Sequence, residues 1–366
     1  MGSLVRESLA SVRRTFAAHV PLYACAAAFC AASWAATAYW RVPLSLDASL
    51  FFLEMVPVFL LLGLSVSAGI FFIGLARRRA ERPLHELGAW LARGFLKGER
   101  PGNSFHGLLA FTPLMVSFAA LKNDIPLIVP FSWDETFARW DRVIGFGRAP
   151  WEWLQPWLGH PPVTAAINLV YDGWFAVMFG ALIWQAFSAR TGTLRMQFLL
   201  AFAFAWFFAG NVLAVVFSSA GPCYYGLLHL PPDSHGGPYA AQMDYLRAAA
   251  AQWPVWSVGV QDALWRSYTG GHATVSGISA MPSMHVVIAV VVTMLGWRTN
   301  RWLGAALALF TGVIVVGAVH LAWHYAVDTI AGAALGFFFW YAAGAVARRY
   351  QAWLAATRRP AWAPAS

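Results

Sequence analysis

Eight long runs of apolar residues, separated by polar segments, set the pattern of the whole chain. They lie at residues 19–40, 51–76, 105–121, 163–187, 195–217, 283–297, 302–321 and 328–347. Most approach the length of about 20 residues that an apolar helix needs to cross the hydrocarbon core of a bilayer. Lipid offers no hydrogen-bond partners, so the backbone must satisfy its own, as a helix does. The pattern predicts an all-α polytopic membrane protein with about eight transmembrane helices.

A basic segment follows the second apolar run. Its charged residues are Arg77, Arg78, Arg79, Arg82, Arg93, Lys97 and Arg100. Apolar residues recur among them at helical spacing, namely Leu84, Leu87, Trp90, Leu91 and Phe95. This combination predicts an amphipathic helix that lies on the membrane surface, with a solvated linker as the alternative.

Residues 122–162 contain six prolines and many tryptophans, so they are not expected to cross the membrane. Tryptophan at this density is typical of a segment at the level of the lipid headgroups. Asp134 and Asp141 lie seven residues apart within it and can share a helix face. We expect both to be structural and paired with Arg139 or Arg142; a role in substrate binding is the alternative.

The composition excludes a soluble protein. Of the 366 residues, 59% are hydrophobic and 11% are charged, whereas soluble domains average about 25% charged residues. The net charge of +9 has no soluble basic domain to carry it, so nucleic acid is not an expected partner. Cys25, Cys30 and Cys223 form no disulfide framework. The length of the first run and the interfacial residues after it favour an uncleaved anchor over a signal peptide.

Loop charges predict the orientation of the chain. With eight spans, both termini lie on one side, and that side carries eighteen Lys and Arg residues against seven on the other. The seven are Arg41, Lys122, Arg139, Arg142, Arg148, Arg247 and Arg266. Cytoplasmic loops are enriched in Lys and Arg, so both termini are predicted to be cytoplasmic.

Two short units at the ends of the late apolar runs suit phosphoryl chemistry. Pro282 fits the first turn of a helix, and Ser283 can cap the free amides of that turn. His285 is therefore expected beside a helix N-terminus, which favours an anion. In the second unit, His324 and Asp328 lie one helical turn apart on one face. The loop charges place both units on the extracytoplasmic side.

These residues suffice for phosphoryl transfer in two steps. Neutral His324 can attack phosphorus to give a phosphohistidine, while Asp328 fixes the tautomer and orientation of the ring. His285 can protonate the leaving oxygen and then deprotonate the incoming hydroxyl. The scheme requires no metal and no cofactor; a metal site built from the same three residues is the alternative.

The two units resemble signature motifs of the type 2 phosphatidic acid phosphatase superfamily. Its second motif reads P-S-G-H, and residues 282–285 match it with Met284 in place of glycine. Its third motif reads S-R-x5-H-x3-D, and His324 and Asp328 match its end, although Gly317 and Ala318 replace Ser-Arg. We find no first motif, K-x6-R-P, at the expected place. In these departures the sequence resembles one branch of the superfamily, the inositol phosphorylceramide synthase-like phosphotransferases and their bacterial relatives.

The resemblance covers roughly residues 130–345 and implies the same three catalytic roles. It implies a six-span catalytic core at residues 105–347, preceded by an extension of two spans and an amphipathic helix at 1–104. Residues 348–366 form a basic cytoplasmic tail. The protein is expected in the bacterial inner membrane with its active site on the extracytoplasmic face.

Phosphate binding needs other groups, because the basic residues of the family motifs are missing. The helix amides near Ser283 can supply part of it. The other candidates for substrate binding are His320, Arg266, His272, Tyr224 and Tyr225. The tyrosines can instead be interfacial anchors, and His272 a solvated loop residue.

Asp172 lies inside the fourth run, where a charged carboxylate is costly if it faces lipid. We expect it to face the bundle. It either contacts the polar headgroup of a substrate or forms a hydrogen bond with Asn211 or another polar group.

Three functions are compatible with the sequence. The first is a lipid phosphotransferase that moves a phospho-headgroup between lipids, and the second is a lipid phosphate or pyrophosphate phosphatase with the same triad. The third is a haem-binding or transport protein, which the histidines at span ends and the lack of matched breaks disfavour. The expected partners are a phospholipid or lipid-phosphate substrate and the bilayer; the oligomeric state stays open.

The predicted orientation can be tested by cysteine labelling in a cysteine-free background. An impermeant reagent is expected to label a cysteine at position 234 in intact cells and to leave one at position 299 unlabelled. Labelling of Thr299→Cys together with protection of Ser234→Cys would invert the topology.

Overall fold

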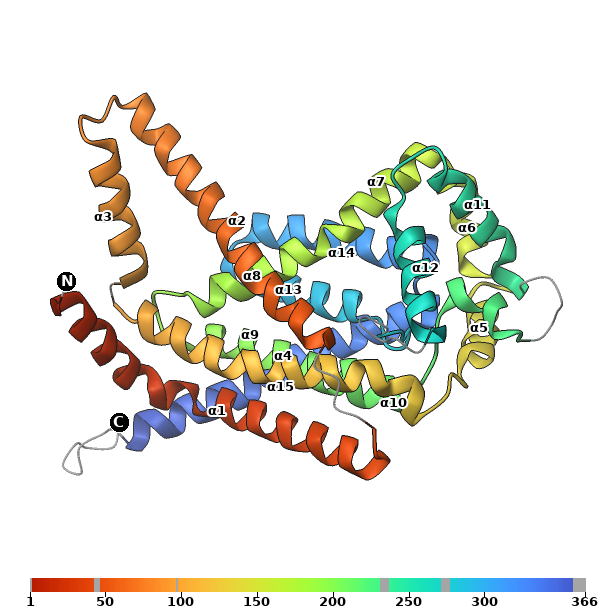
Figure 1. The fold of residues 1–366 in the computed structure, drawn as a ribbon, viewed down its shortest axis with the longest axis horizontal. Coiled ribbons are helices and arrows are strands. Elements are labelled where there is room, and N and C mark those ends of the chain that lie inside the picture. Colours follow the sequence, from red (N-terminus) through yellow and green to blue (C-terminus); the bar gives the residue numbers. More distant parts are fainter. Residues whose placement is uncertain (1, 43–46, 97, 231–236, 271–276, 358–366) are drawn as a thin grey trace.

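The computed structural model describes residues 2–42, 47–96, 98–230, 237–270 and 277–357, and every regular element in these ranges is helical. Figure 1 shows the arrangement of these helices. His272 and Ser234, both named above, lie outside the described residues.

Six helical stretches among the described residues are long and apolar enough to cross a membrane. They are α1 (Gly2–Trp40), α4 (Arg100–Ile128), α7 with α8 (Pro161–Asp172, Trp174–Ala186), α9 with η1 and α10 (Thr193–Phe204, Ala205–Leu213, Ala214–Val216), α14 (Arg301–His320) and α15 (Ala326–Thr357). Two shorter apolar stretches are residues 63–77 of α2 (Asp47–Arg77) and α13 (Met284–Thr299). The chain is therefore an all-α polytopic membrane protein, as predicted.

The structure corrects two predicted boundaries. α4 does not end at Leu121 but continues to Ile128, so Lys122 lies in a helix and not in the following loop. The fourth run is interrupted at Gly173, between α7 and α8. In addition, the loop predicted after residue 218 contains two helices, α11 (Ala240–Ala250) and α12 (Trp256–Thr269).

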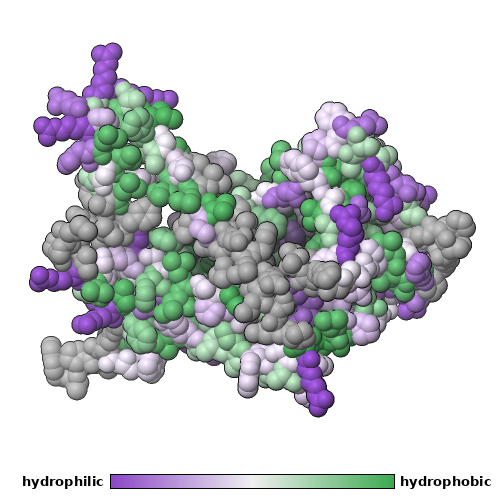
Figure 2. All heavy atoms as spheres, viewed as in Figure 1, coloured by the Kyte–Doolittle hydropathy of each residue, from purple (hydrophilic) through white to green (hydrophobic). Residues whose placement is uncertain are grey.

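Short helices cover one end of the bundle. α5 (Asp134–Ile144), α6 (Pro150–Leu158), α11 and α12 gather at the end opposite the two chain termini (Figure 1). Hydrophilic residues concentrate toward these two ends in Figure 2, whereas hydrophobic residues are more frequent between them. This distribution fits a bundle whose middle lies in the bilayer.

α13 forms the centre of the bundle. Residues 286–292 are all nearly or fully buried, and a helix that is apolar on every side is expected to be enclosed by others. α15 approaches α13 closely at two glycines. A Cβ on Gly336 would lie 2.7 Å from Cβ of Val290, and one on Gly332 would lie 2.8 Å from the Ser283 carbonyl. The absence of side chains there brings the start of α15 against the start of α13.

A buried arginine joins the N-terminal extension to the core. Arg195 at the start of α9 donates from Nε to the Gln185 carbonyl (2.6 Å), which is one of the last carbonyls of α8. Its guanidinium also lies 2.7 Å from Nε2 of His19 in α1. A cation at a helix C-terminus is favourable, so Arg195 ties α1 and α9 to the end of α8.

The basic segment contains α3 (Pro83–Leu96), which follows α2. Trp90 of α3 stacks on Phe71 of α2 with ring centres 4.9 Å apart, and Arg78 forms an ion pair with Glu86 (2.5 Å). The helix predicted there exists. Its location on the membrane surface stays a prediction.

Candidate active site

His324 lies in the turn between α14 and α15. Its ring nitrogen Nδ1 is 2.8 Å from the Ala280 carbonyl, and a carbonyl only accepts, so Nδ1 carries the proton. Nε2 is then the unprotonated nitrogen. The side chain is buried, and the amide of His324 donates to the Ala318 carbonyl (3.0 Å). The backbone and the ring are thus both fixed.

Asp328 does not form the hydrogen bond that we expected with His324. Its Oδ2 lies 3.6 Å from Nδ1 of His324, beyond the usual hydrogen-bond range of about 2.7–3.2 Å, and instead accepts from the Tyr325 amide (2.9 Å). The orientation of His324 therefore comes from Ala280. The carboxylate of Asp328 is close enough to stabilise a positive charge on the ring.

His285 lies next to His324, with ring centres 6.2 Å apart. Its ring stacks on Tyr171, with ring centres 4.5 Å apart, and lies 4.3 Å from the centre of Trp174. The indole of Trp174 also donates to the His285 carbonyl (2.9 Å). The structure thus brings together the two histidines that the sequence places 39 residues apart.

Ser283 differs from its predicted role as a helix cap. α13 begins at Met284, so Pro282 lies before the first turn, and the side chain of Ser283 makes no capping hydrogen bond. Its hydroxyl is fully buried and has no partner among the described residues. The amide of Ser283 donates to the Asp328 carbonyl (3.2 Å), which links the two units. A buried, unused hydroxyl costs free energy, and a substrate oxygen would satisfy it.

Lys122 lies close enough to His324 to affect it electrostatically, and the sequence analysis did not include it among the candidate residues. Burial lowers the pKa of His324 to about 4, and the positive charge of Lys122 adds to this decrease. The signal was present in the sequence. Lys122 is followed by six residues, then Val129 and Pro130, which is the K-x6-R-P pattern with valine in place of arginine. The prediction that the first motif is absent is therefore wrong in part: its lysine and proline are present, and its arginine is replaced by Val129.

Asp134 and Asp141 are buried but are not paired with Arg139 or Arg142. Asp134 accepts from the amides of Ala220 (2.9 Å) and Gly221 (2.8 Å) and from the hydroxyl of Tyr325 (2.8 Å). Asp141 accepts from the amides of Ala326 (2.9 Å) and Val327 (3.0 Å), at the first turn of α15. The expected partners were wrong because these carboxylates serve free backbone amides.

Asp134 also reaches His324 indirectly, through the loop that it holds. Ser219, next to Ala220, accepts at its carbonyl from the Ala280 amide (2.8 Å) and at its hydroxyl from the Met281 amide (3.2 Å). The Ala280 carbonyl is the group that binds His324. α5 therefore supports both segments that carry the histidine.

Three of the other predicted binding residues contact groups outside the histidine pair, and the fourth, Arg266, is exposed. The Tyr224 hydroxyl donates to the Gln261 carbonyl (3.1 Å), and Tyr225 packs on Tyr239 within an apolar cluster. His320 lies 2.9 Å from the Thr164 hydroxyl through Nε2. The Arg266 side chain is exposed on α12.

Asp172 is half-buried and accepts from the side-chain amide of Asn168 (2.7 Å). Asn211 is therefore not its partner. Asn168 in turn accepts from the hydroxyl of Ser257 (2.6 Å), which itself accepts from the indole of Trp323 (3.1 Å). Asp172 is thus at the end of a polar chain that begins next to His324.

The helices define an integral membrane protein, and half-buried His285 beside buried His324 forms its candidate site. Among the described residues, no group of three or more His, Cys, Asp or Glu is placed to hold a metal ion. A model of the PAP2 superfamily matches residues 135–342. The chain therefore belongs to the PAP2 superfamily, whose members are phosphatases or phosphotransferases. No curated protein and no solved structure matches it.

The hydrogen bonds of α5 predict the effect of Asp141→Asn. An amide can accept from only one of the two backbone donors, which leaves the other unpaired at a cost of about 1–3 kcal/mol. The melting temperature in detergent is expected to fall, and turnover with it. Glu135→Gln is the control, because Glu135 is exposed on the same helix and loses the same charge. Equal stability of the two variants would contradict this role of Asp141.

Proposed function

We propose that the protein is a lipid phosphotransferase that acts through a phosphohistidine at His324. The observation that carries the proposal is the hydrogen bond from Nδ1 of His324 to the Ala280 carbonyl. It leaves Nε2 unprotonated in a ring whose centre is 6.2 Å from that of His285. A neutral imidazole of fixed tautomer beside a second histidine is suited to nucleophilic attack with acid–base assistance.

The reaction proceeds in two balanced steps. Nε2 of His324 attacks phosphorus, the bond from phosphorus to the lipid oxygen breaks, and protonated His285 gives its proton to that oxygen. The proton stays on Nδ1, where it is hydrogen-bonded to the Ala280 carbonyl, so the phosphorylated ring is cationic. The Asp328 carboxylate, 3.6 Å from Nδ1, stabilises this positive charge. In the second step His285 takes the proton of an acceptor hydroxyl, which attacks phosphorus and releases His324.

Three groups are available to stabilise the transferring phosphate. Lys122 supplies a positive charge near His324. The free amides at the start of α13 face an anion favourably, and the unused hydroxyl of Ser283 lies at the same place. Lys122 takes the role that we had assigned to loop residues, whereas Arg266, Tyr224 and His320 have no support from their contacts.

A phosphatase is the second candidate, because water can replace the acceptor hydroxyl in the same scheme. The superfamily contains both activities. We place the site on the extracytoplasmic face of a bacterial inner membrane, with both termini in the cytoplasm; the loop charges support this orientation.

Transfer and hydrolysis can be separated in one assay. Purified protein is given phosphatidylinositol with a labelled headgroup, with and without ceramide or diacylglycerol. A transferase moves the label to the acceptor, whereas a phosphatase releases it into water at the same rate in both samples.

His324→Ala is expected to abolish both transfer and hydrolysis, and His160→Ala, which changes an exposed histidine, is expected to have no effect. Full activity of His324→Ala would refute the mechanism.

Lys122→Met tests the stabilisation of the phosphate. Removal of one preorganised charge at a developing anion typically lowers kcat by about 10²–10³-fold. Lys122→Arg keeps the charge and is expected to retain more activity. If both variants match the parent protein, Lys122 does not contact the phosphate.

The pH dependence follows from the pKa of His324. Because its value is lowered from 6.5 to about 4, His324 stays neutral under mildly acidic conditions. With a phosphodiester donor, whose charge is constant, the loss of kcat/KM caused by protonation of His324 is expected near pH 4 and not near pH 6.5. The need for a protonated His285 acts in the opposite direction, because its protonated fraction rises as the pH falls.

Stability has to be followed in the same experiment. The unfolded chain binds this proton more tightly than the folded protein. His324 therefore contributes stability above pH 6.5 that is lost as the pH falls through about 4. Half-loss of kcat/KM near pH 6.5 in a protein that is still folded would contradict the assignment.

A further inference from the structure

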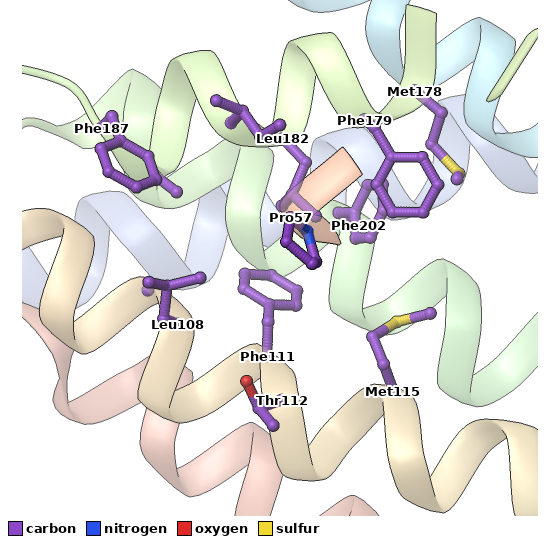
Figure 3. Close-up of a pocket in the computed structure, with 13 residues that line it drawn as sticks. Pro57, Leu108, Phe111, Thr112, Met115, Met178, Phe179, Leu182, Phe187 and Phe202 are labelled. Atoms are coloured by element: carbon purple, nitrogen blue, oxygen red, sulfur yellow. The ribbon is translucent and has the colours of Figure 1, made fainter. Parts of the chain in front are cut away.

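An apolar cavity of about 180 Å³ lies between α2, α4, α8 and α9, inside the membrane-spanning part of the chain. Figure 3 shows Pro57, Phe111, Leu182 and Phe202 around its centre. Among the described residues that line it, Thr112 supplies the only side-chain hydroxyl and none is charged. Apolar cavities of about 150 Å³ stay free of water and bind apolar molecules of the size of benzene. The cavity is therefore suited to part of a hydrocarbon chain.

α8 connects this cavity to the candidate active site. The helix begins at Trp174, whose ring centre lies 4.3 Å from that of His285 and whose indole donates to the His285 carbonyl. Met178 and Leu182, one and two turns further along, line the cavity. At a rise of about 1.5 Å per residue they lie roughly 6 and 12 Å below Trp174. The cavity thus begins about one helical turn from the histidine pair and continues away from it.

The far end of the cavity is closed by polar interactions. Phe187 lines it there, and the Phe187 carbonyl accepts from Nε of Arg100 (2.8 Å). Arg195 binds the neighbouring Gln185 carbonyl (2.6 Å). A hydrocarbon chain has no favourable contact with two guanidinium groups, so an acyl chain is not expected to extend past Phe187. By helical rise Phe187 is roughly 20 Å from Trp174.

These dimensions correspond to one acyl chain. The hydrocarbon core of a bilayer is about 30 Å thick, so the tails of one leaflet reach about 15 Å. A lipid whose phosphate lies at His324 would direct a tail along α8 and place the outer half of that tail, which ends in the methyl group, beside Leu182 and Phe187. Among the described lining residues, a headgroup or a water molecule would find only the Thr112 hydroxyl as a side-chain polar partner.

We propose that the cavity binds the outer half of one acyl chain of the lipid substrate and limits the length of chain that the enzyme accepts. This inference rests on the proposed function, because it takes the phosphate of the same lipid to lie at His324. It also gives the N-terminal extension a role, since Pro57 of α2 forms part of the cavity wall.

Adjacent leucines on α4 offer a matched test. Leu108 lines the cavity, whereas Leu109 lines a separate groove between α1 and α4. Leu108→Trp is expected to lower kcat/KM about tenfold for phosphatidylinositol with 16-carbon chains, because about two methylene groups of the chain would lose their apolar site. It should change kcat/KM less than twofold for 8-carbon chains. Leu109→Trp should affect both chain lengths equally.

A photolabel tests the site in the unmodified protein and does not require turnover. The probe is phosphatidylinositol with a diazirine near the methyl end of a 16-carbon chain, and the labelled peptides are identified by mass spectrometry. Labels on Met178–Phe187 support the cavity; on α4 only labels at Leu108, Phe111, Thr112 or Met115 count, because Leu109 faces the other groove. Labels confined to the groove between α1 and α4, or equal effects of Leu108→Trp and Leu109→Trp on chain-length preference, overturn it.

The two proposals fail differently. If the photolabel reacts in the cavity but the protein turns over no donor, the acyl-chain site is supported and the proposed function is wrong. Turnover that depends on His324, with labels only outside the cavity, would retain the function and overturn the acyl-chain site.

Discussion

The hydrogen bond between Nδ1 of His324 and the Ala280 carbonyl is the constraint on which the site depends. It decides which ring nitrogen is free, and it joins the two segments that carry the histidines. The Ala280 carbonyl is itself held through Ser219 and the loop at Ala220, which Asp134 binds. Asp141 fixes the first amides of α15 from the same short helix. The short helix α5 thus positions both loops of the candidate site.

Helix packing explains how these loops meet. α13 has only 16 residues, about 24 Å at the helical rise, which is less than the hydrocarbon thickness of about 30 Å. Its start, with His285, is therefore expected below the membrane surface, at the depth where a lipid phosphate meets its acyl chains. The glycines at 332 and 336 let α15 pack against it, so that Asp328 and Ser283 are linked directly through the backbone.

Periodicity and motif spacing predicted the helical membrane fold and the pairing of His285 with His324. Long apolar runs leave little choice of structure in lipid, and the motif histidines lie at the same ends of their helices. The partners of buried carboxylates could not be predicted in this way. Asp134, Asp141 and Asp172 bind backbone amides or a neighbouring asparagine, and these contacts depend on how loops distant in the sequence fold back. The sequence analysis did not identify Lys122 for two reasons. It ended the third apolar run at residue 121, whereas α4 continues to Ile128, and the motif that begins at Lys122 has valine in place of arginine.

The central claim is that Nε2 of His324 attacks phosphorus while Ala280 retains the proton on Nδ1. The most direct test is to trap the intermediate from a labelled donor by rapid quenching at alkaline pH and to determine the phosphorylated atom by tandem mass spectrometry and NMR. The account predicts phosphate on Nε2 of His324 and on no other residue. Phosphate on Nδ1, on His285 or on a serine would contradict it.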